Sequence, residues 1–221
     1  EALSDAIDQL IPYIAPSDEV KDAFLPLLER EIQRMVGENA LVCDSYVHMV
    51  NEKHFRRVCG LIDPDKVIFG GQADERTLRI QPTIMDRVTA DDAVMQEEIF
   101  GPLLPVIAYD SIDEALAFVN GREHPLALYL FSENPALQKR VLASVPFGGG
   151  CINDTIVHLA TSRMGFGGVG HSGMGSYHGK KSFDTFSHEK SVLKKSTRID
   201  MPVRYMPYTP LKDRLLRVFL R

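Results

Sequence analysis

The 221-residue sequence has no tryptophan, no long apolar run and only three cysteines. Its apolar stretches are shorter than the roughly 18 residues of a membrane-spanning helix, so a membrane span is not expected. The cysteines have no close pair spacing, which argues against a disulfide framework and a zinc cluster. Residues 1–10 are acidic and have no signal-peptide core, so the expected location is cytoplasmic.

Positive charge is also scarce, because 25 basic residues face 30 acidic ones and leave a net charge of −5. Nucleic acid is therefore not an expected partner, since phosphate binding needs a basic surface. The seven histidines form no HExxH motif or i, i+4 pair, and no metal site is expected. A hydrophobic content of 44% and a charged content of 25% are typical of a globular protein of one or two domains.

The middle of the chain alternates apolar segments with short amphipathic ones. The sequence predicts strands at residues 66–69, 79–85, 103–109 and 126–131 and from 150, and helices at 20–35, 52–62, 115–119 and 135–143 and from 210. Apolar strands that alternate with helices indicate a parallel sheet covered on both faces. Ser17 is the expected cap of the first helix, and Pro26 is expected to kink or split that helix. A further strand is expected at Lys190–Leu193.

A glycine-rich segment at residues 165–175 has six glycines in 11 positions and is predicted to be a loop. Gly168, Gly170 and Gly173 match the dinucleotide fingerprint G-x-G-x-x-G letter by letter. That fingerprint needs a buried strand before it and an apolar helix after it, and neither pattern flanks these glycines. A structural loop that passes close to an active site is the favoured interpretation.

An acid and an aromatic residue, Glu98 and Phe100, stand just before the apolar segment that begins at Leu103. A carboxylate at a sheet edge can accept hydrogen bonds from ribose hydroxyls, and a ring can pack on a flat heterocycle. The alternative interpretation is an exposed acid beside a turn.

The cysteines and histidines offer no clear catalytic pair. Cys59 lies on the apolar side of a helix and is expected in the core. Cys151 follows three glycines into a strand and is expected to point into packing, and Cys43 has no assigned place. No cysteine has an activating partner nearby in the sequence, and each histidine alone is typical of a surface or core residue.

The chain resembles the aldehyde dehydrogenase superfamily, and within it the class 3 branch of fatty and aromatic aldehyde dehydrogenases. The matching blocks follow the family's order and lie at residues 51–58, 95–102, 125–129, 153–158, 165–175 and 177–188. The resemblance covers roughly residue 45 to the C-terminus. It implies an α/β fold, with a three-layer parallel-sheet catalytic domain of aldehyde dehydrogenase type at residues 1–186. Residues 187–221 would supply a C-terminal oligomerisation strand and helix.

The resemblance also implies a function: oxidation of an aldehyde to a carboxylic acid with NAD or NADP, in a homodimer. Glu98 resembles the acid that holds the nicotinamide ribose, and Phe100 resembles the ring beside the nicotinamide. Asn153 and His158 lie where the family lines its aldehyde pocket. In the family a cysteine attacks the aldehyde, a glutamate acts as general base, and hydride passes to the cofactor.

The sequence departs from the family where the chemistry is done. It holds no Gly-Gln-x-Cys segment, no matching general-base segment and no preceding nucleotide-binding domain. No catalytic residue is therefore assigned, and the chain is expected to be a catalytic-domain fragment that is inactive alone. The alternatives are a non-catalytic dimerisation module and a pseudoenzyme that binds nucleotide through Glu98 and Phe100. Peripheral membrane contact by the basic C-terminal helix is considered but not expected.

Overall fold

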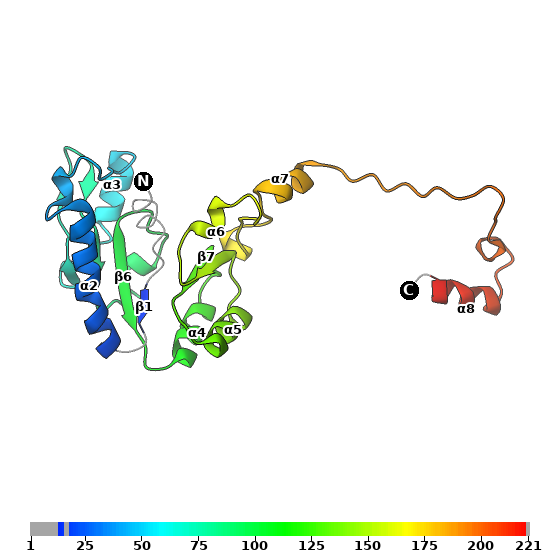
Figure 1. The fold of residues 1–221 in the computed structure, drawn as a ribbon, viewed down its shortest axis with the longest axis horizontal. Coiled ribbons are helices and arrows are strands. Elements are labelled where there is room, and N and C mark those ends of the chain that lie inside the picture. The colour runs from blue at the N-terminus through cyan, green and yellow to red at the C-terminus, as the bar shows by residue number, and fades with distance from the viewer. Residues whose placement is uncertain (1–12, 16–17, 220–221) are drawn as a thin grey trace. The chain divides into compact units, whose positions relative to one another are not determined.

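The computed structural model describes residues 13–15 and 18–219 of the chain (Figure 1). Its strands are β1 (Tyr13–Ala15), β2 (Val67–Phe69), β3 (Ala73–Asp74), β4 (Arg79–Ile80), β5 (Thr83–Met85), β6 (Leu103–Ala108), β7 (Ala127–Leu130) and β8 (Gly149–Ile152). Its α-helices are α2 (Asp18–Val36), α3 (Glu52–Cys59), α4 (Ile112–Asn120), α5 (Pro135–Ser144), α6 (Val157–Ala160), α7 (Gly179–Phe186) and α8 (Pro210–Phe219). The chain divides into two compact units, Glu1–Phe186 and Ser187–Arg221.

The largest sheet has the strand order β1-β6-β5-β2. β6 is its centre and pairs in parallel with β1 on one side and with β5 on the other. β2 joins the outer edge of β5 in the antiparallel direction, which the sequence pattern did not indicate. The parallel core is as expected, because a strand that is apolar throughout can be buried on both faces.

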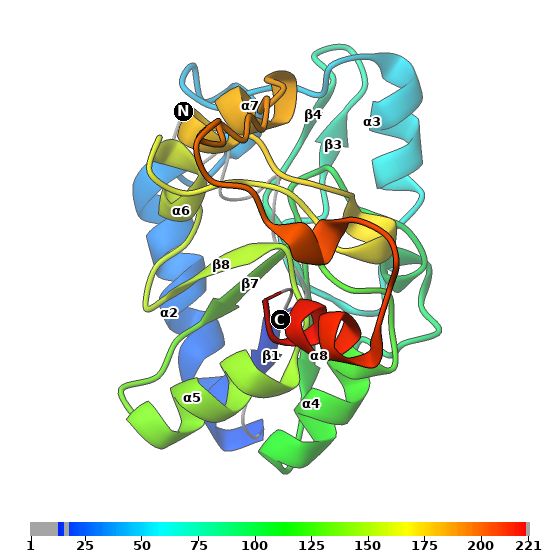
Figure 2. The same cartoon turned by 90° about the vertical axis from the view of Figure 1, so that its right-hand side faces the viewer.

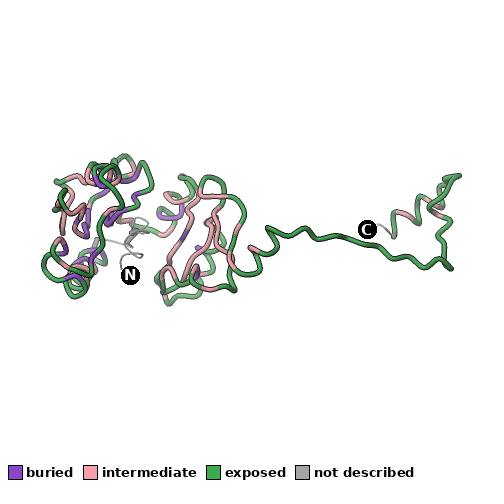
Figure 3. The backbone as a smooth tube through the Cα atoms, turned by 90° about the horizontal axis from the view of Figure 1, so that it is seen from above, coloured by how far each residue is buried: buried purple, intermediate pink, exposed green. Residues whose placement is uncertain are grey.

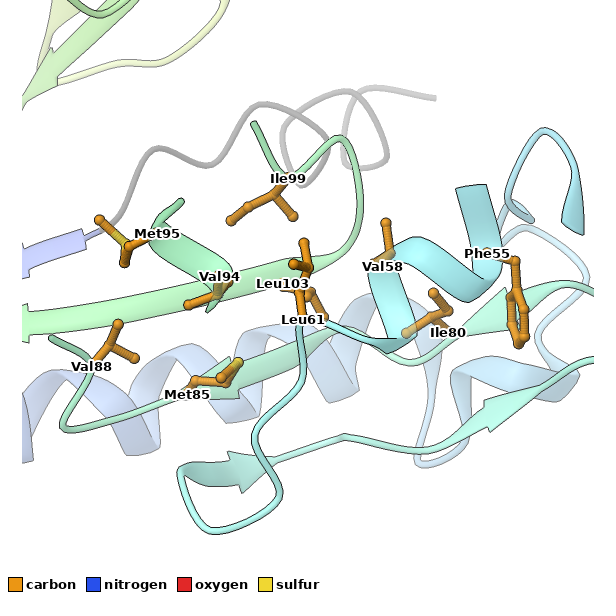
Figure 4. Close-up of a cluster of buried hydrophobic side chains, with 10 residues drawn as sticks. All are labelled: Phe55, Val58, Leu61, Ile80, Met85, Val88, Val94, Met95, Ile99 and Leu103. Carbon is orange, nitrogen blue, oxygen red and sulfur yellow. The ribbon is translucent and has the colours of Figure 1, made fainter. Parts of the chain in front are cut away.

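The two faces of this sheet are covered by different helices, which makes the three layers predicted from the resemblance. Leu104 and Val106 of β6 pack with Ile84 of β5 and with Leu25 of α2. Their neighbours along the strands point the other way, because successive side chains of a strand alternate between faces. That second face carries the main core, to which α3 contributes (Figure 4). Its buried members are Phe55, Val58, Leu61, Ile80, Met85, Val88, Val94, Met95, Ile99 and Leu103.

The parallel pair β7 and β8 forms a sheet of its own, with Tyr129 directly opposite Cys151. Helices α4 and α5 lie beside this pair (Figure 2) and bury Leu116 and Val141 against it. Both helices begin at a polar capping residue, Ser111 for α4, as the S-x-x-E pattern indicates, and Asn134 for α5. The Ser111 hydroxyl accepts from the Glu114 amide at 3.3 Å, and Asn134 accepts from two amides at the start of α5.

The expectation that Pro26 splits the first helix is wrong, because α2 runs unbroken from Asp18 to Val36. Proline removes one backbone hydrogen bond. Residues on both sides of it, including Leu25 and Ile32, pack against the sheet and hold the two halves in one helix. The predicted cap, Ser17, lies outside the described residues.

Residues 187–218 are exposed apart from Val203, Lys212 and Leu216 (Figure 3). α8 forms where the sequence predicts a C-terminal helix. The strand expected at Lys190–Leu193 does not form within the chain, since residues 187–196 are neither helix nor strand. Among the described residues, no helix is both long and apolar enough to cross a membrane.

Leu103 tests the core because it is fully buried where α3 meets β6. We expect Leu103→Ala to lower the free energy of unfolding by about 2–5 kcal/mol, through lost burial and the cavity left behind. The control is Val50→Ala, at a side chain that is 77% exposed, with a change of no more than about 0.5 kcal/mol. Urea denaturation of both variants measures the difference, and equal losses would contradict the packing described above.

Candidate functional site

The loop between the short 3-10 turn Ala93–Met95 and β6 carries the two predicted cofactor residues. Ile99 is 8% exposed and packs into the main core, while its neighbours Glu98 and Phe100 face outwards. Phe100 has a φ of 44° and is 61% exposed. The loop is thus anchored at its middle residue and presents a carboxylate and a ring on either side of the anchor.

The side chain of Arg57, on α3, binds the backbone of this loop. Its Nη2 donates to the Ile99 carbonyl at 2.5 Å, and its Nη1 donates to the Glu98 carbonyl at 3.1 Å. The same guanidinium pairs with the Glu97 carboxylate at 3.4 Å. These bonds use backbone carbonyls and the side chain of Glu97. The carboxylate of Glu98 is exposed and has no hydrogen-bond or ion-pair partner among the described residues.

Gly101 allows α3 to approach the loop this closely. A Cβ on Gly101 would lie 2.7 Å from Cγ1 of Val58, which is closer than side-chain atoms can pack. Val58 itself is fully buried in the main core. One helix therefore supports the loop by two neighbouring residues, Arg57 through hydrogen bonds and Val58 through packing.

The predicted substrate-pocket residues, Asn153 and His158, lie at the carboxyl end of β8. Asn153 has a φ of 56°. Its Oδ1 accepts from the Ser132 amide at 2.7 Å and its Nδ2 donates to the Ser132 carbonyl at 3.1 Å. These bonds tie the segment after β7 to the segment after β8, so the Asn153 side chain shapes this end of the sheet.

His158 stands on the short helix α6 and is 5% exposed. Its Nδ1 lies 3.5 Å from Sγ of Cys151, a hydrogen-bond distance for sulfur. Its ring packs edge-on against Tyr129 at a centroid distance of 5.8 Å and lies 6.0 Å from Phe166. Burial holds the pKa of His158 below its usual value, because the charged imidazolium loses hydration there.

The glycine-rich segment is a loop, as predicted, and not a dinucleotide-binding turn. Phe166 and Tyr177 form an isolated bridge at its base, and a 3-10 turn at Gly170–Ser172 occupies its tip. No buried strand precedes it, and α7 begins only at Gly179. A Cβ on Gly168 would lie 2.1 Å from the Ser172 carbonyl oxygen, so this glycine serves the close folding of the loop on itself.

The structure groups the predicted residues in two pairs. Glu98 and Phe100 share one loop, and Asn153 and His158 share the end of β8. Among the residues that the structure describes, no hydrogen bond, ion pair or ring contact joins one pair to the other.

Two contacts in the candidate site are not predicted from the sequence. Cys151 was expected to point into packing without a partner, yet it meets the imidazole of His158, seven residues further on. Arg57 was not singled out, although it contacts the Glu98 loop across 41 residues of sequence. For the Cys151–His158 contact, the one available sequence signal is a cysteine followed by a histidine across a tight turn. The sequence carries no signal for the contact between Arg57 and the Glu98 loop.

Comparison with known proteins shows the family to which the chain belongs. Residues 14–192 match the family model described as "Aldehyde dehydrogenase family". The structure "Substrate bound state of Staphylococcus aureus AldH" superposes with a TM-score of 0.87 at 46% identity, over 95% of this chain and 46% of that one. The chain therefore belongs to the aldehyde dehydrogenase family.

Two curated relatives narrow the comparison. The 4,4'-diaponeurosporen-aldehyde dehydrogenase of Staphylococcus aureus is 48% identical over 198 residues, which cover 89% of this chain and 43% of the relative. The mouse protein named "Aldehyde dehydrogenase, dimeric NADP-preferring" is 45% identical over 84% of this chain and 41% of its own length. The chain spans less than half the length of these relatives.

Arg57 and its neighbour Arg56 allow a matched test of the loop support. Arg56 is exposed and pairs only with Glu52 and Glu75 among the described residues. Hydrogen bonds to a charged group contribute about 1.5–3 kcal/mol, so we expect Arg57→Ala to speed local opening of the loop roughly tenfold or more. The measurement is hydrogen exchange at the Leu103 amide, which donates to the Gly101 carbonyl at 2.8 Å. Arg56→Ala should leave this rate unchanged, and equal rates in the two variants would refute the support by Arg57.

The buried His158 predicts a pH dependence of stability. Its pKa in the folded chain is lowered by burial, and the titratable groups that face it are Cys151 and Tyr129. In the unfolded chain it binds a proton below about pH 6.5, so the folded state loses stability as the pH falls through that value. We expect His158→Asn to remove up to about 1.4 kcal/mol of the stability difference between pH 7.5 and pH 5.5. Urea denaturation at both pH values measures it, and an unchanged difference would contradict the burial effect.

Proposed function

We propose that this chain forms the C-terminal part of the catalytic domain of an NAD(P)-dependent aldehyde dehydrogenase of class 3. The complete enzyme would oxidise an aldehyde to a carboxylic acid. The observation that carries the proposal is the Glu98–Phe100 loop, which presents an exposed carboxylate and an exposed ring from an anchored backbone. The 48% identity to a named aldehyde dehydrogenase supports it.

In this proposal Glu98 and Phe100 hold the nicotinamide half of NAD or NADP. The exposed carboxylate suits the donation of hydrogen bonds by ribose hydroxyls, and the exposed ring offers a flat apolar surface. Both side chains are free for this because Arg57 binds the loop through its carbonyls. When bound, the dinucleotide supplies the hydride acceptor.

Asn153 and His158 contribute to the aldehyde pocket in the same proposal. Asn153 fixes the ends of β7 and β8 through Ser132, and so sets the shape of the wall rather than its polarity. His158 is uncharged near neutral pH, because burial lowers its pKa. Together with Tyr129 and Phe166 it forms an aromatic surface without a charged group, which suits an uncharged aldehyde.

The proposal divides the chain into a partial catalytic domain at residues 1–186 and an oligomerisation segment at residues 187–221. A homodimer is the proposed assembly, and the mouse relative is named dimeric. The predicted strand Lys190–Leu193 would then form by pairing with a partner subunit. A cytoplasmic location is also proposed, and the three free cysteines suit a reducing compartment.

We expect the 221-residue chain alone to form no NAD(P)H from an aldehyde, since it holds no Gly-Gln-x-Cys segment. A chimera tests the function directly: the chain replaces the matching segment of the Staphylococcus aureus relative, to which it is 48% identical. The chimera should oxidise aldehydes, and Glu98→Gln should raise its KM for the dinucleotide roughly tenfold by loss of a charge-assisted hydrogen bond. Asp91→Asn, at an exposed acid before the loop, is the control and should leave KM unchanged.

Two outcomes would contradict the proposal. One is a chimera that folds and binds the dinucleotide without oxidising aldehydes, which would favour the pseudoenzyme. The other is turnover by the 221-residue chain alone that Cys151→Ala abolishes, because the nucleophile would then lie within this chain.

A further inference from the structure

At the end of β8, the thiol of Cys151 and the imidazole of His158 lie close together beside aromatic rings. Tyr129 and Cys151 are directly opposed across the parallel pair β7 and β8. The chain then turns sharply, with positive φ values of 56° at Asn153 and 57° at Ile156, and returns as α6. This turn carries His158 back over the strand it has just left, so that its Nδ1 meets Cys151 Sγ at 3.5 Å.

The imidazole is placed to act as a base toward this thiol. His158 is 5% exposed, and Nδ1 is the ring nitrogen that faces the thiol, so a neutral imidazole can accept the S–H proton at that atom. Its Nε2 is buried and finds no hydrogen-bond partner among the described residues. When Nδ1 accepts from the thiol, Nε2 carries the ring hydrogen, and a buried donor without a partner costs free energy that an aldehyde oxygen in the site would recover.

The surroundings select the kind of molecule that can reach the thiol. Cys151 is half-buried, so part of the residue reaches the surface. The rings of Tyr129 and Phe166 flank the His158 ring, and the buried Tyr129 hydroxyl has no hydrogen-bond partner among the described residues. No carboxylate or cation of the described residues contacts the Cys151–His158 pair. This environment favours a planar, uncharged molecule, and a thiol reacts best with a soft electrophilic carbon.

We propose that Cys151 and His158 form a covalent modification site for α,β-unsaturated aldehydes. The thiol sulfur forms a bond to the β-carbon of the aldehyde, and the S–H bond breaks as the proton passes to Nδ1 of His158. The imidazole then returns that proton to the α-carbon of the resulting enolate. The net reaction is an addition, so it consumes no oxidant and no dinucleotide, and it does not depend on aldehyde oxidation by the chain.

The other two cysteines provide internal controls. Cys59 packs against the main core, and burial first, then the charge of Glu75, raises the pKa of its thiol. Cys43 packs against the small cluster of Val36, Ala40 and Tyr46. Neither has an imidazole within hydrogen-bond distance in the part of the chain that the structure describes.

The test treats the purified 221-residue chain with trans-cinnamaldehyde at pH 7.5 without dinucleotide. Borohydride then fixes the adducts, and peptide mass spectrometry gives a rate for each cysteine. We expect Cys151 to react at least tenfold faster than Cys43 and Cys59, because general-base assistance contributes roughly 10²–10⁴ in rate. His158→Asn keeps a hydrogen-bond acceptor near the position of Nδ1 but cannot take up the proton, and should lower the rate at Cys151 at least tenfold.

Two controls accompany this measurement, a saturated aldehyde and a check of the fold. The saturated analogue 3-phenylpropanal should leave no adduct on Cys151, since it has no electrophilic β-carbon. Circular dichroism checks the fold of His158→Asn, and the comparison of three cysteines in the unaltered chain needs no variant. Equal rates at the three cysteines, or an unchanged Cys151 rate in folded His158→Asn, would overturn the proposal. Because no dinucleotide is present, failure here leaves the proposed oxidation untouched, and failure of the chimera leaves this site untouched.

Discussion

The rest of the first unit depends on the burial of β6 on both faces. Leu103 faces the main core, Leu104 and Val106 face α2, and the strand pairs in parallel on both edges. A shift of one residue would exchange the two faces of the strand, so the alternation also fixes the register of β1 and β5 around it. The loop that carries Glu98 and Phe100 leads directly into β6, so the position of this strand fixes one end of the loop.

Much of the fold could be predicted from local pattern. The strands at β2, β6, β7 and β8 and the helices α3, α4, α5 and α8 lie within a few residues of the predicted segments, because apolar spacing and caps such as Asn51 and Ser111 act locally. The failures come from tertiary packing. The intact helix around Pro26 is held by residues of the sheet, and the antiparallel direction of β2 depends on a pairing with β5. Neither cause is visible within a short window of sequence.

The candidate site likewise contains residues that the sequence indicates and residues that only the folded structure shows. Glu98 could be singled out by its residue type and by its place before a buried strand, and Asn153 and His158 by the family resemblance. Arg57 could not, since its role rests on hydrogen bonds to two carbonyls that any residue type would offer. The pairing of Cys151 with His158 could not either, because it needs the two positive φ values at Asn153 and Ile156 that reverse the chain.

Helix α3 connects the main core to the exposed Glu98–Phe100 loop. Val58 belongs to the main core, and the next residue on its N-terminal side, Arg57, holds the backbone of the exposed loop. Ile99 completes the link, because it packs in the same core as Val58 while Glu98 and Phe100 beside it face outwards. Buried neighbours on both sides of the contact thus position Glu98 and Phe100. In the proposed function this arrangement would limit the entropy lost when the dinucleotide binds. A change that loosens the packing of α3 should therefore disturb the loop before it unfolds the sheet.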